Sequence, residues 1–397
     1  MSSKEKILMV MPVMKGGGAE RVASLLLNEF SRNGYDCEFL LTSSKKDDVI
    51  NRDLNPDIPI ASVFSGKKNS FFFRILEIIA SLLCKPFEMF KINVPAAFAY
   101  LSFFVQYHNE IKALREKLKN EPDSKIISFL QPSVPMTLIA AKGLPNRILI
   151  SERGDPKRLL KKRYGYNFIK KYYQRADAVV YQTNDAMAVY PDNISKKGTV
   201  IFNPINDKLP EPYYGEREKN ITTFCRISRQ KNLPVLVESF AEFHKEFSDY
   251  RLRIIGEPQN NDDRASLSEA TALADKLGVT DCIDFELFSS KVHDLIIRDA
   301  MYMNSSDYEG MSNAMLEAMA IGMPVVCTDC PIGGANAVID NNENGILTQV
   351  GNAKEMCEAM KKIASDTEFA DKLSHNASQI RYKLSLENTA KKWMELF

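Results

Sequence analysis

Two glutamates lie close together in the stretch YEGMSNAMLEAMA, where seven residues separate Glu309 from Glu317. Gly310 permits unusual backbone angles, Ser312 and Asn313 are helix-capping types, and the residues after them favour a helix. We therefore expect Glu309 in a loop and Glu317 about one turn inside a helix. The free amides at that helix start favour a diphosphate, and the two carboxylates are suited to accept hydrogen bonds from sugar hydroxyls.

Two cations, Arg226 and Lys231, are spaced as R-x4-K in CRISRQKNLPVLVESF, between an expected strand and an expected helix. In a doubly wound sheet such a loop faces the crevice where ligands bind, so the pair is well placed for a pyrophosphate. The same charges would stabilise a departing nucleotide diphosphate. Arg229, between them, is explained equally well by a solvated loop and is given no role.

The triple glycine 16–18 follows the first expected strand and would let the backbone approach a substrate at Gly17 and Gly18. It is a poor dinucleotide fingerprint, because Arg21 stands where that motif needs its third glycine. No Asp-x-Asp occurs in the chain. We therefore expect no metal clamp on a diphosphate and no cofactor.

Seven cysteines are scattered along the chain, and an odd number makes a disulfide framework improbable. Cys327 and Cys330 form a CxxC, but no second Cys or His pair lies nearby to complete a zinc site. The polar start leads into an apolar run that is too short for a signal peptide and lacks a cleavage pattern. A reduced, cytoplasmic setting is expected.

Residues 157–175, called here the basic segment, hold eight Lys and Arg and no acidic residue, interleaved with Tyr and Phe. Three interpretations are open: a surface for lipid headgroups or a lipid pyrophosphate, a nucleic-acid site, or a solvated face. We favour the first, because the chain shows no RNA-binding motif and its second half is acidic. Its candidate contacts are Lys161, Lys162 and Arg163.

Residues 67–107 are rich in Phe and flanked by Lys and Arg, yet each apolar run is shorter than the roughly 18 residues that a membrane span needs. Two interpretations stay open. The segment forms interfacial helices whose aromatic face enters lipid, or it forms ordinary helices buried against a sheet.

Apolar runs that alternate with amphipathic stretches predict strands and helices in turn along most of the chain. In the first half, strands are expected at 7–11, 37–42, 125–130, 147–151, 177–182 and 199–202. In the second half, they are expected at 221–225, 251–255, 282–287, 300–303, 324–327 and 345–347. Strands that alternate with helices call for parallel sheets with right-handed crossovers, so we predict two Rossmann-like, doubly wound α/β domains.

A Pro- and Glu-containing stretch, 203–219, lacks apolar periodicity and is the expected linker. The predicted domains are 1–203 and 204–379, with the C-terminal helix in 380–397 packing back on the first. Residues 1–203 carry 31 Lys and Arg against 20 Asp and Glu, a net charge of +11, and the remainder carries 21 against 31, a net of −10. The basic half suggests an anionic partner, either a membrane surface or a pyrophosphate-linked substrate.

These blocks together resemble the family 4 glycosyltransferases of the GT-B fold. The similar stretches are GGGAERV, RISRQK, IIGE and YEGMSNAMLEAMAIGMPVVCTDCP, which occur in the family's order and span most of the chain. The Glu-x7-Glu block is the specific part. SFLQPS followed by ISERGDP looks like the members that build bacterial surface polysaccharides and lipid-linked oligosaccharides.

The resemblance implies a retaining, metal-independent transfer of a sugar from a nucleotide sugar, of the UDP type, to a saccharide or lipid-linked acceptor. In such a protein two domains face a central cleft, the N-terminal one binding the acceptor. Arg226 and Lys231 would bind the diphosphate, Glu309 the donor sugar and Glu317 the ribose. Backbone contacts to sugar and phosphate would come from Gly310, Met311, Ser312 and Asn313.

The chain departs from the family in its first domain, where SFLQPS lacks the His that many members carry near the donor sugar. None of the four histidines lies in a matching motif, and Glu152 and Arg153 are the candidates for that place. The Phe-rich segment and the basic segment together predict a peripheral position on the inner face of the cell membrane. A nucleotide-sugar epimerase of the same fold and a non-catalytic nucleotide-sugar-binding protein are the alternative functions.

Overall fold

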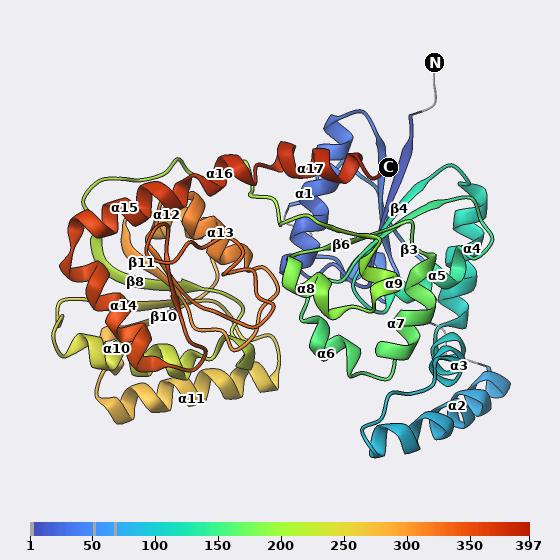
Figure 1. The fold of residues 1–397 in the computed structure, drawn as a ribbon, viewed down its shortest axis with the longest axis horizontal. Helices are drawn as coiled ribbons and strands as arrows, with labels where there is room; N and C mark the ends of the chain where they lie inside the picture. The colour runs from blue at the N-terminus through green and yellow to red at the C-terminus, as the bar shows by residue number, and fades with distance from the viewer. Residues whose placement is uncertain (1–3, 51–52, 67–69) are drawn as a thin grey trace. The chain divides into compact units, whose positions relative to one another are not determined.

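The computed structural model describes residues 4–50, 53–66 and 70–397 (Figure 1). The chain divides into two compact units. Unit 1 runs to Pro204 and regains Leu386–Phe397, and unit 2 is Ile205–Ser385. The return to unit 1 thus comes at Leu386 and not at residue 380, because α16 (Ile380–Lys383) ends beside a bridge between Ile205 and Ser385 inside unit 2.

Unit 1 is built on a parallel sheet in which the described strands follow the order β3-β2-β1-β4-β5-β6-β7. The direction of winding changes between β1 and β4. The strands are β1 (Lys6–Met11), β2 (Asp36–Leu41), β3 (Ile60–Ser62), β4 (Lys125–Phe129), β5 (Arg147–Ser151), β6 (Ala178–Tyr181) and β7 (Gly198–Val200). All were expected from the sequence except β3, a half-buried edge strand of three residues.

Both faces of this sheet are covered, as successive side chains of β1 show. Leu8 and Val10 enter one apolar cluster, while Ile7 and Met9 enter another on the opposite face. The described helices are α1 (Gly18–Arg32), α2 (Phe71–Met89), α3 (Ala96–Gln106), α4 (His108–Asn120), α5 (Ser133–Ala140), α6 (Pro156–Leu160), α7 (Tyr166–Tyr172), α8 (Asn184–Val189), α9 (Asp192–Ser195) and α17 (Leu386–Met394). The short 3-10 helices are η1 (Lys46–Asp48) and η2 (Tyr173–Arg175).

The C-terminal helix α17 packs against α1, as Figure 1 shows. Trp393 on α17 is almost fully buried, and its ring lies 5.6 Å from that of Phe129 at the end of β4. None of the described helices combines the length and the apolar character that a membrane span requires.

Unit 2 has a second parallel sheet, whose described strands follow the order β10-β9-β8-β11-β12-β13. The strands are β8 (Glu218–Phe224), β9 (Arg251–Ile255), β10 (Ile283–Glu286), β11 (Asp299–Asn304), β12 (Val325–Thr328) and β13 (Ile346–Thr348). The helices are α10 (Leu233–His244), α11 (Asn261–Leu277), α12 (Val292–Ile296), α13 (Asn313–Ala320), α14 (Ala353–Ser365), α15 (Thr367–Ser378) and α16, with η3 (Arg229–Lys231) and η4 (Thr280–Cys282). The prediction of two doubly wound parallel-sheet domains is confirmed.

A buried carboxylate fastens the central strands of unit 2 together. Asp299, fully buried at the start of β11, accepts hydrogen bonds from Thr222 on β8, from Asn220 on the same strand at 3.1 Å and from Arg253 on β9 at 2.9 Å. A buried charge is tolerated when it is paired in this way. The network fixes β8 against β11, and these two strands carry the candidate site at their other ends.

Candidate active site

The strands β8 and β11 are neighbours at the point where the winding of unit 2 reverses. Ligands of doubly wound sheets bind outside the carboxyl ends of the strands at such a switch point. Here β8 leads into Arg226 and η3, and β11 leads into a loop that ends at the start of α13. The fold therefore brings the R-x4-K pair and the Glu-x7-Glu block to one place.

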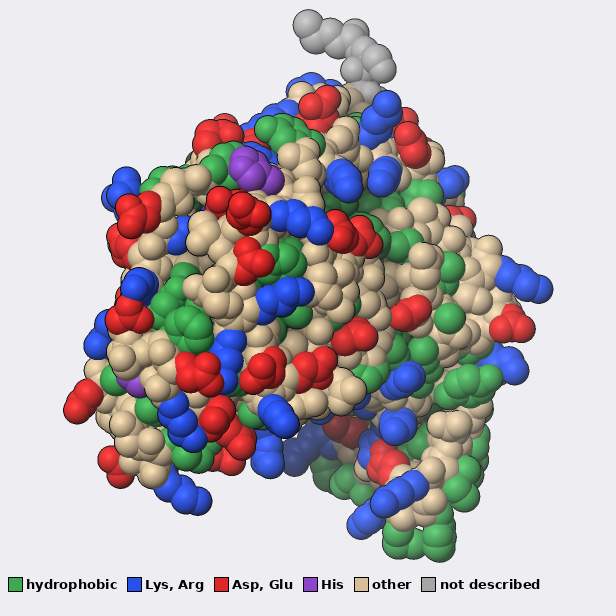
Figure 2. Space-filling view, turned by 60° about the vertical axis from the view of Figure 1, so that its left-hand side comes forward, with side chains coloured by type: hydrophobic (Ala, Val, Ile, Leu, Met, Phe, Trp, Pro, Cys, Tyr) green, Lys and Arg blue, Asp and Glu red, His purple; other side chains and the backbone are tan. Residues whose placement is uncertain are grey.

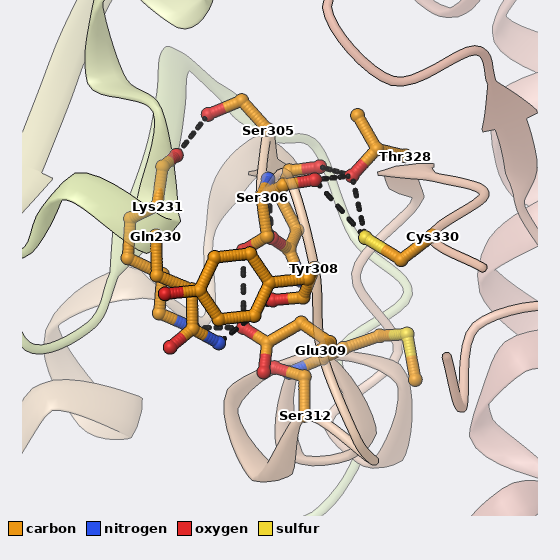
Figure 3. A network of polar contacts seen from close by, with 11 residues as sticks. Gln230, Lys231, Ser305, Ser306, Tyr308, Glu309, Ser312, Thr328 and Cys330 are labelled. Carbon is orange, nitrogen blue, oxygen red and sulfur yellow. Dashed lines mark hydrogen bonds and ion pairs between the residues drawn. The ribbon is translucent and has the colours of Figure 1, made fainter. Parts of the chain in front are cut away.

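Lys231 and Glu309 form an ion pair across this switch point (Figure 3). Both side chains are largely buried, with exposed fractions of 17% and 14%. The Ser306 hydroxyl donates a second hydrogen bond, of 3.0 Å, to the same Glu309 oxygen. The sequence-predicted cation and carboxylate thus contact each other.

Burial lowers the pKa of Lys231, but the charge of Glu309, the nearby Cys225 and the hydrogen bond to Glu309 together outweigh burial, so the pKa is raised above its usual value. Lys231 is therefore a cation at neutral pH. Arg226 is exposed, and its charge also acts on Lys231. Two positive charges accordingly lie near each other at the carboxyl end of β8, where a diphosphate would balance them.

Polar side chains that the sequence analysis did not single out connect the loop after β8 to the loop after β11. The Ser305 hydroxyl donates to the Lys231 carbonyl at 2.8 Å, and the Gln230 amide donates to the Tyr308 carbonyl at 2.7 Å (Figure 3). The Thr328 hydroxyl donates to the Ser306 carbonyl at 2.7 Å. These bonds fix the geometry of the Lys231–Glu309 pair.

The CxxC cysteines are part of this packing. Both are buried, and the Cys330 thiol donates to the Ser306 carbonyl at 3.0 Å. Burial raises the pKa of Cys330 to about 11, so this thiol stays protonated at neutral pH. Within residues 4–50, 53–66 and 70–397, no group of three or more His, Cys, Asp or Glu side chains is arranged to hold a metal ion.

The helix start predicted after Glu309 is the beginning of α13. Ser312 is its N-cap and accepts a hydrogen bond of 3.3 Å from the Met315 amide. Gly310 and Met311 lie against the loop after β12, where a Cβ added to Gly334 would come within 2.7 Å of the Met311 Cα. Only glycine fits this approach. The loop that leads to Asn313 is thereby fixed.

Glu317 lies on α13 with only 5% of its surface exposed, and the Nε2 atom of His293 is 2.9 Å from its Oε2 atom. His293 lies on α12 and stacks edge-on against Phe224 at the end of β8. Sequence reasoning gave this histidine no role because it lies in no motif. Its position just after β10, at another carboxyl end of the sheet, was the available signal.

The glycine loop 16–18 belongs to unit 1, whereas the other residues predicted to bind a donor belong to unit 2. The Glu20 carboxylate accepts hydrogen bonds there from the amides of Lys15, at 2.6 Å, and Gly17, at 2.8 Å. The chain's own side chain thus occupies the position that a bound anion would take at the start of α1. Gly18 is the first residue of that helix.

Glu152 and Arg153 follow β5 at the carboxyl edge of the unit 1 sheet. The Tyr173 hydroxyl donates a hydrogen bond of 2.6 Å to Glu152, and burial raises the pKa of Glu152 to about 7. Arg153 donates to the Asn203 side chain and lies 4.9 Å from the centre of the Phe129 ring. Burial lowers the pKa of Arg153 to about 9.

Replacing Glu152 with glutamine is expected to remove a pH dependence of stability. Because the folded-state pKa is raised from 4.5 to about 7, the stabilisation is present below pH 4.5 and is lost as the pH rises through 7. A shift of this size corresponds to about 3 kcal/mol. The free energy of unfolding of the wild type and of the Glu152→Gln variant is measured by denaturant unfolding between about pH 5 and 8. Equal pH profiles would contradict it.

In the basic segment, Lys161 and Lys162 are exposed, and the charge of Lys162 acts on Glu152. The Arg163 side chain contacts α2 instead. Its guanidinium donates to both carboxylate oxygens of Glu88, on α2, at 2.5 and 2.9 Å. The segment therefore reaches from the sheet edge of unit 1 to α2.

Comparison with known proteins shows which proteins this chain resembles. Residues 210–380 match the family described as Glycosyl transferases group 1. The whole chain is 22% identical to an uncharacterized glycosyltransferase of Haemophilus influenzae, with 97% of each chain covered. It is 23% identical to N-acetylgalactosamine-N,N'-diacetylbacillosaminyl-diphospho-undecaprenol 4-alpha-N-acetylgalactosaminyltransferase of Campylobacter jejuni, over 66% of this chain and 72% of the relative.

Among solved structures, HepE of Anabaena, crystallised in complex with UDP, superposes with a TM-score of 0.75 at 15% identity and 98% coverage of both chains. This likeness concerns the fold alone. Residues 210–380 match the group 1 glycosyl transferases, and the chain as a whole has the GT-B fold and is similar to bacterial glycosyltransferases.

Proposed function

We propose that the chain transfers a sugar from a nucleotide sugar, of the UDP type, to a saccharide or lipid-linked acceptor in bacterial polysaccharide or glycan assembly. Transfer would retain the anomeric configuration and need no metal. The observation that carries the proposal is the Lys231–Glu309 pair at the strand switch of unit 2, beside the start of α13. A pair of cations next to a helix start is suited to a diphosphate leaving group.

Each side chain has a role in this proposal. Arg226 and Lys231 bind the diphosphate and stabilise the charge that grows on it as the sugar leaves. Glu309, held by Ser306, accepts hydrogen bonds from the donor sugar, and Glu317 accepts them from the ribose. The backbone of 310–313 contacts sugar and phosphate. In front-side retention the leaving phosphate takes the acceptor proton, so no enzyme nucleophile is required.

The acceptor is assigned to unit 1, whose carboxyl sheet edge holds Glu152 and Arg153 next to the exposed Lys161 and Lys162. A lipid-linked pyrophosphate would be attracted by these charges. The Campylobacter jejuni relative is named for a diphospho-undecaprenol-linked acceptor, which supports this class. Such an acceptor would place the protein peripherally on the inner face of the cell membrane.

A screen of nucleotide sugars tests the proposal. The purified chain is incubated with UDP-, GDP- and ADP-linked sugars with and without EDTA, and thermal stabilisation and donor hydrolysis are followed. Ligand at a hundred times its Kd stabilises a protein by about 2.7 kcal/mol. We expect UDP-sugars to stabilise the chain and to be hydrolysed slowly despite EDTA. Release of an isomerised nucleotide sugar would identify an epimerase. Tight binding of the donor without turnover in the presence of membrane extract would identify a non-catalytic binding protein.

A further inference from the structure

Helix α2 in unit 1 exposes an unusually large amount of apolar surface. Of its 19 residues only Ala80 and Cys84 are buried. Large apolar side chains that are 42% to 78% exposed include Phe71, Phe72, Ile75, Ile78, Ile79 and Leu82. Figure 2 shows hydrophobic side chains gathered at the lower right edge, where Figure 1 places α2. Contiguous exposed patches of this kind mark interaction surfaces.

The exposed apolar residues lie on one side of the helix, because their spacings of three, four and seven residues match the helical repeat. The charged residues Arg74, Glu77, Lys85 and Glu88 fall outside this stripe, on one flank of it. The buried Ala80 and Cys84 lie on the opposite side, which faces α3. The helix thus has an inner face, a charged flank and an uncovered apolar face.

The basic segment is hydrogen-bonded directly to α2 and α3. Arg163 donates to Glu88 on α2 and, at 3.3 Å, to Ser102 on α3. The Asn167 amide donates to the Val94 carbonyl, just before α3, at 3.1 Å. The exposed cations Lys157, Lys161 and Lys162 are therefore held beside the apolar helix, so apolar surface and positive charge lie together.

We infer that α2 lies in the interface of an anionic lipid bilayer, its apolar face among the acyl chains and the basic segment against the headgroups. The inference names the membrane partner of the proposed lipid-linked transfer and rests on that proposed function. An amphipathic helix of this kind binds by apolar burial together with attraction to anionic lipid. The lipid's pyrophosphate then meets Lys161 and Lys162 on the way to the sheet edge.

A second copy of the chain is a poorer occupant of this face. A symmetric dimer through α2 would bring the same patch of both copies together, and with it two basic segments. Like charges at such an interface repel each other. An anionic membrane balances the charge and covers the apolar side chains at once.

Two matched substitutions test the inference. Leu82→Glu adds a carboxylate to the 60% exposed position on α2, and Leu277→Glu adds one to a 40% exposed position at the end of α11 in unit 2. Binding to vesicles of phosphatidylglycerol and phosphatidylethanolamine is measured by co-sedimentation. We expect Leu82→Glu to weaken vesicle binding by roughly tenfold or more, and Leu277→Glu to leave it unchanged. Ile78→Glu, at a second exposed position on the same face, is expected to act like Leu82→Glu.

A second pair of measurements separates this inference from the proposed transferase activity. Thermal stabilisation by UDP-sugar is expected to be the same in wild type and Leu82→Glu, because α2 lies outside unit 2. If no UDP-sugar stabilises the wild type, the proposed function is wrong, but vesicle binding can still be measured. The inference is overturned if wild type and Leu82→Glu sediment equally with vesicles, or if Leu82→Glu converts a dimer to a monomer in sedimentation velocity.

Discussion

Replacing Lys231 with methionine is expected to reduce kcat/KM for sugar transfer by roughly 10²- to 10³-fold, the usual loss when one preorganised charge facing a developing anion is removed. Methionine fills a similar volume but cannot stabilise the departing diphosphate. The raised pKa of Lys231 keeps the wild-type cation intact across the working pH range, so the loss should not depend on pH near neutrality. Initial rates with a UDP-sugar donor and membrane extract as acceptor measure it.

The single substitution also leaves Glu309 without its partner, and an unpaired, largely buried charge is destabilising. The double variant Lys231→Met with Glu309→Gln removes both charges. We expect it to regain thermal stability but not activity. If the double variant recovers transfer, the pair is structural and the proposed role is wrong. Lys219→Met is the matched control, because Lys219 forms an exposed ion pair with Asp249 in the same unit.

The strand pattern was predictable because buried parallel strands carry dense apolar runs. β9 spans Arg251–Ile255, the range that the sequence predicts, and β5 spans Arg147–Ser151 in the same way. β3 was missed for a physical reason. It is a strand of three residues, Ile60–Ser62, whose sequence Ile-Ala-Ser lacks the dense apolar run that identifies a strand.

The Phe-rich segment shows where sequence patterns stop being informative. Its first three residues, 67–69, lie outside the described part of the chain. In the rest, one helix is buried as the second interpretation expects, whereas the contact of the other with lipid stays a prediction. α3 buries Phe103 and Val105 in the core, whereas α2 leaves most of its apolar side chains exposed. Both helices are rich in Phe, but α2 carries four charged residues and α3 carries none. The tertiary contacts show which of the two is buried.

The candidate site was predictable where residue type and loop position coincide, as for Lys231 and Glu309. Contacts between segments that are distant in the sequence were not predictable. Ser306 supports Glu309 through the path of the loop after β11, and no local pattern reveals this. The role of Glu20 was readable, since a Glu three residues after Gly17 has the spacing of a helix cap. That spacing argued against an open anion site at the start of α1.

Replacing Glu317 with alanine is expected to raise the KM for the nucleotide sugar by roughly ten- to a hundredfold. A hydrogen bond that involves a charged group contributes about 1.5–3 kcal/mol, and Glu317 is the carboxylate assigned to the ribose. Its burial and its 2.9 Å contact with His293 hold the acceptor oxygens in a fixed position. Steady-state kinetics with donor varied at saturating acceptor separate this effect on KM from any effect on kcat.

His293 is expected to act through Glu317, as a positioning residue. His293→Ala should raise the donor KM by a smaller factor, and His293→Gln, which keeps a hydrogen-bond donor, should recover part of it. In the double variant with Glu317→Ala the His293 substitution should have no further effect, because residues that act through one contact are not additive. Additive losses in the double variant would mean that His293 contacts the donor itself. An unchanged KM in Glu317→Ala would exclude the ribose assignment.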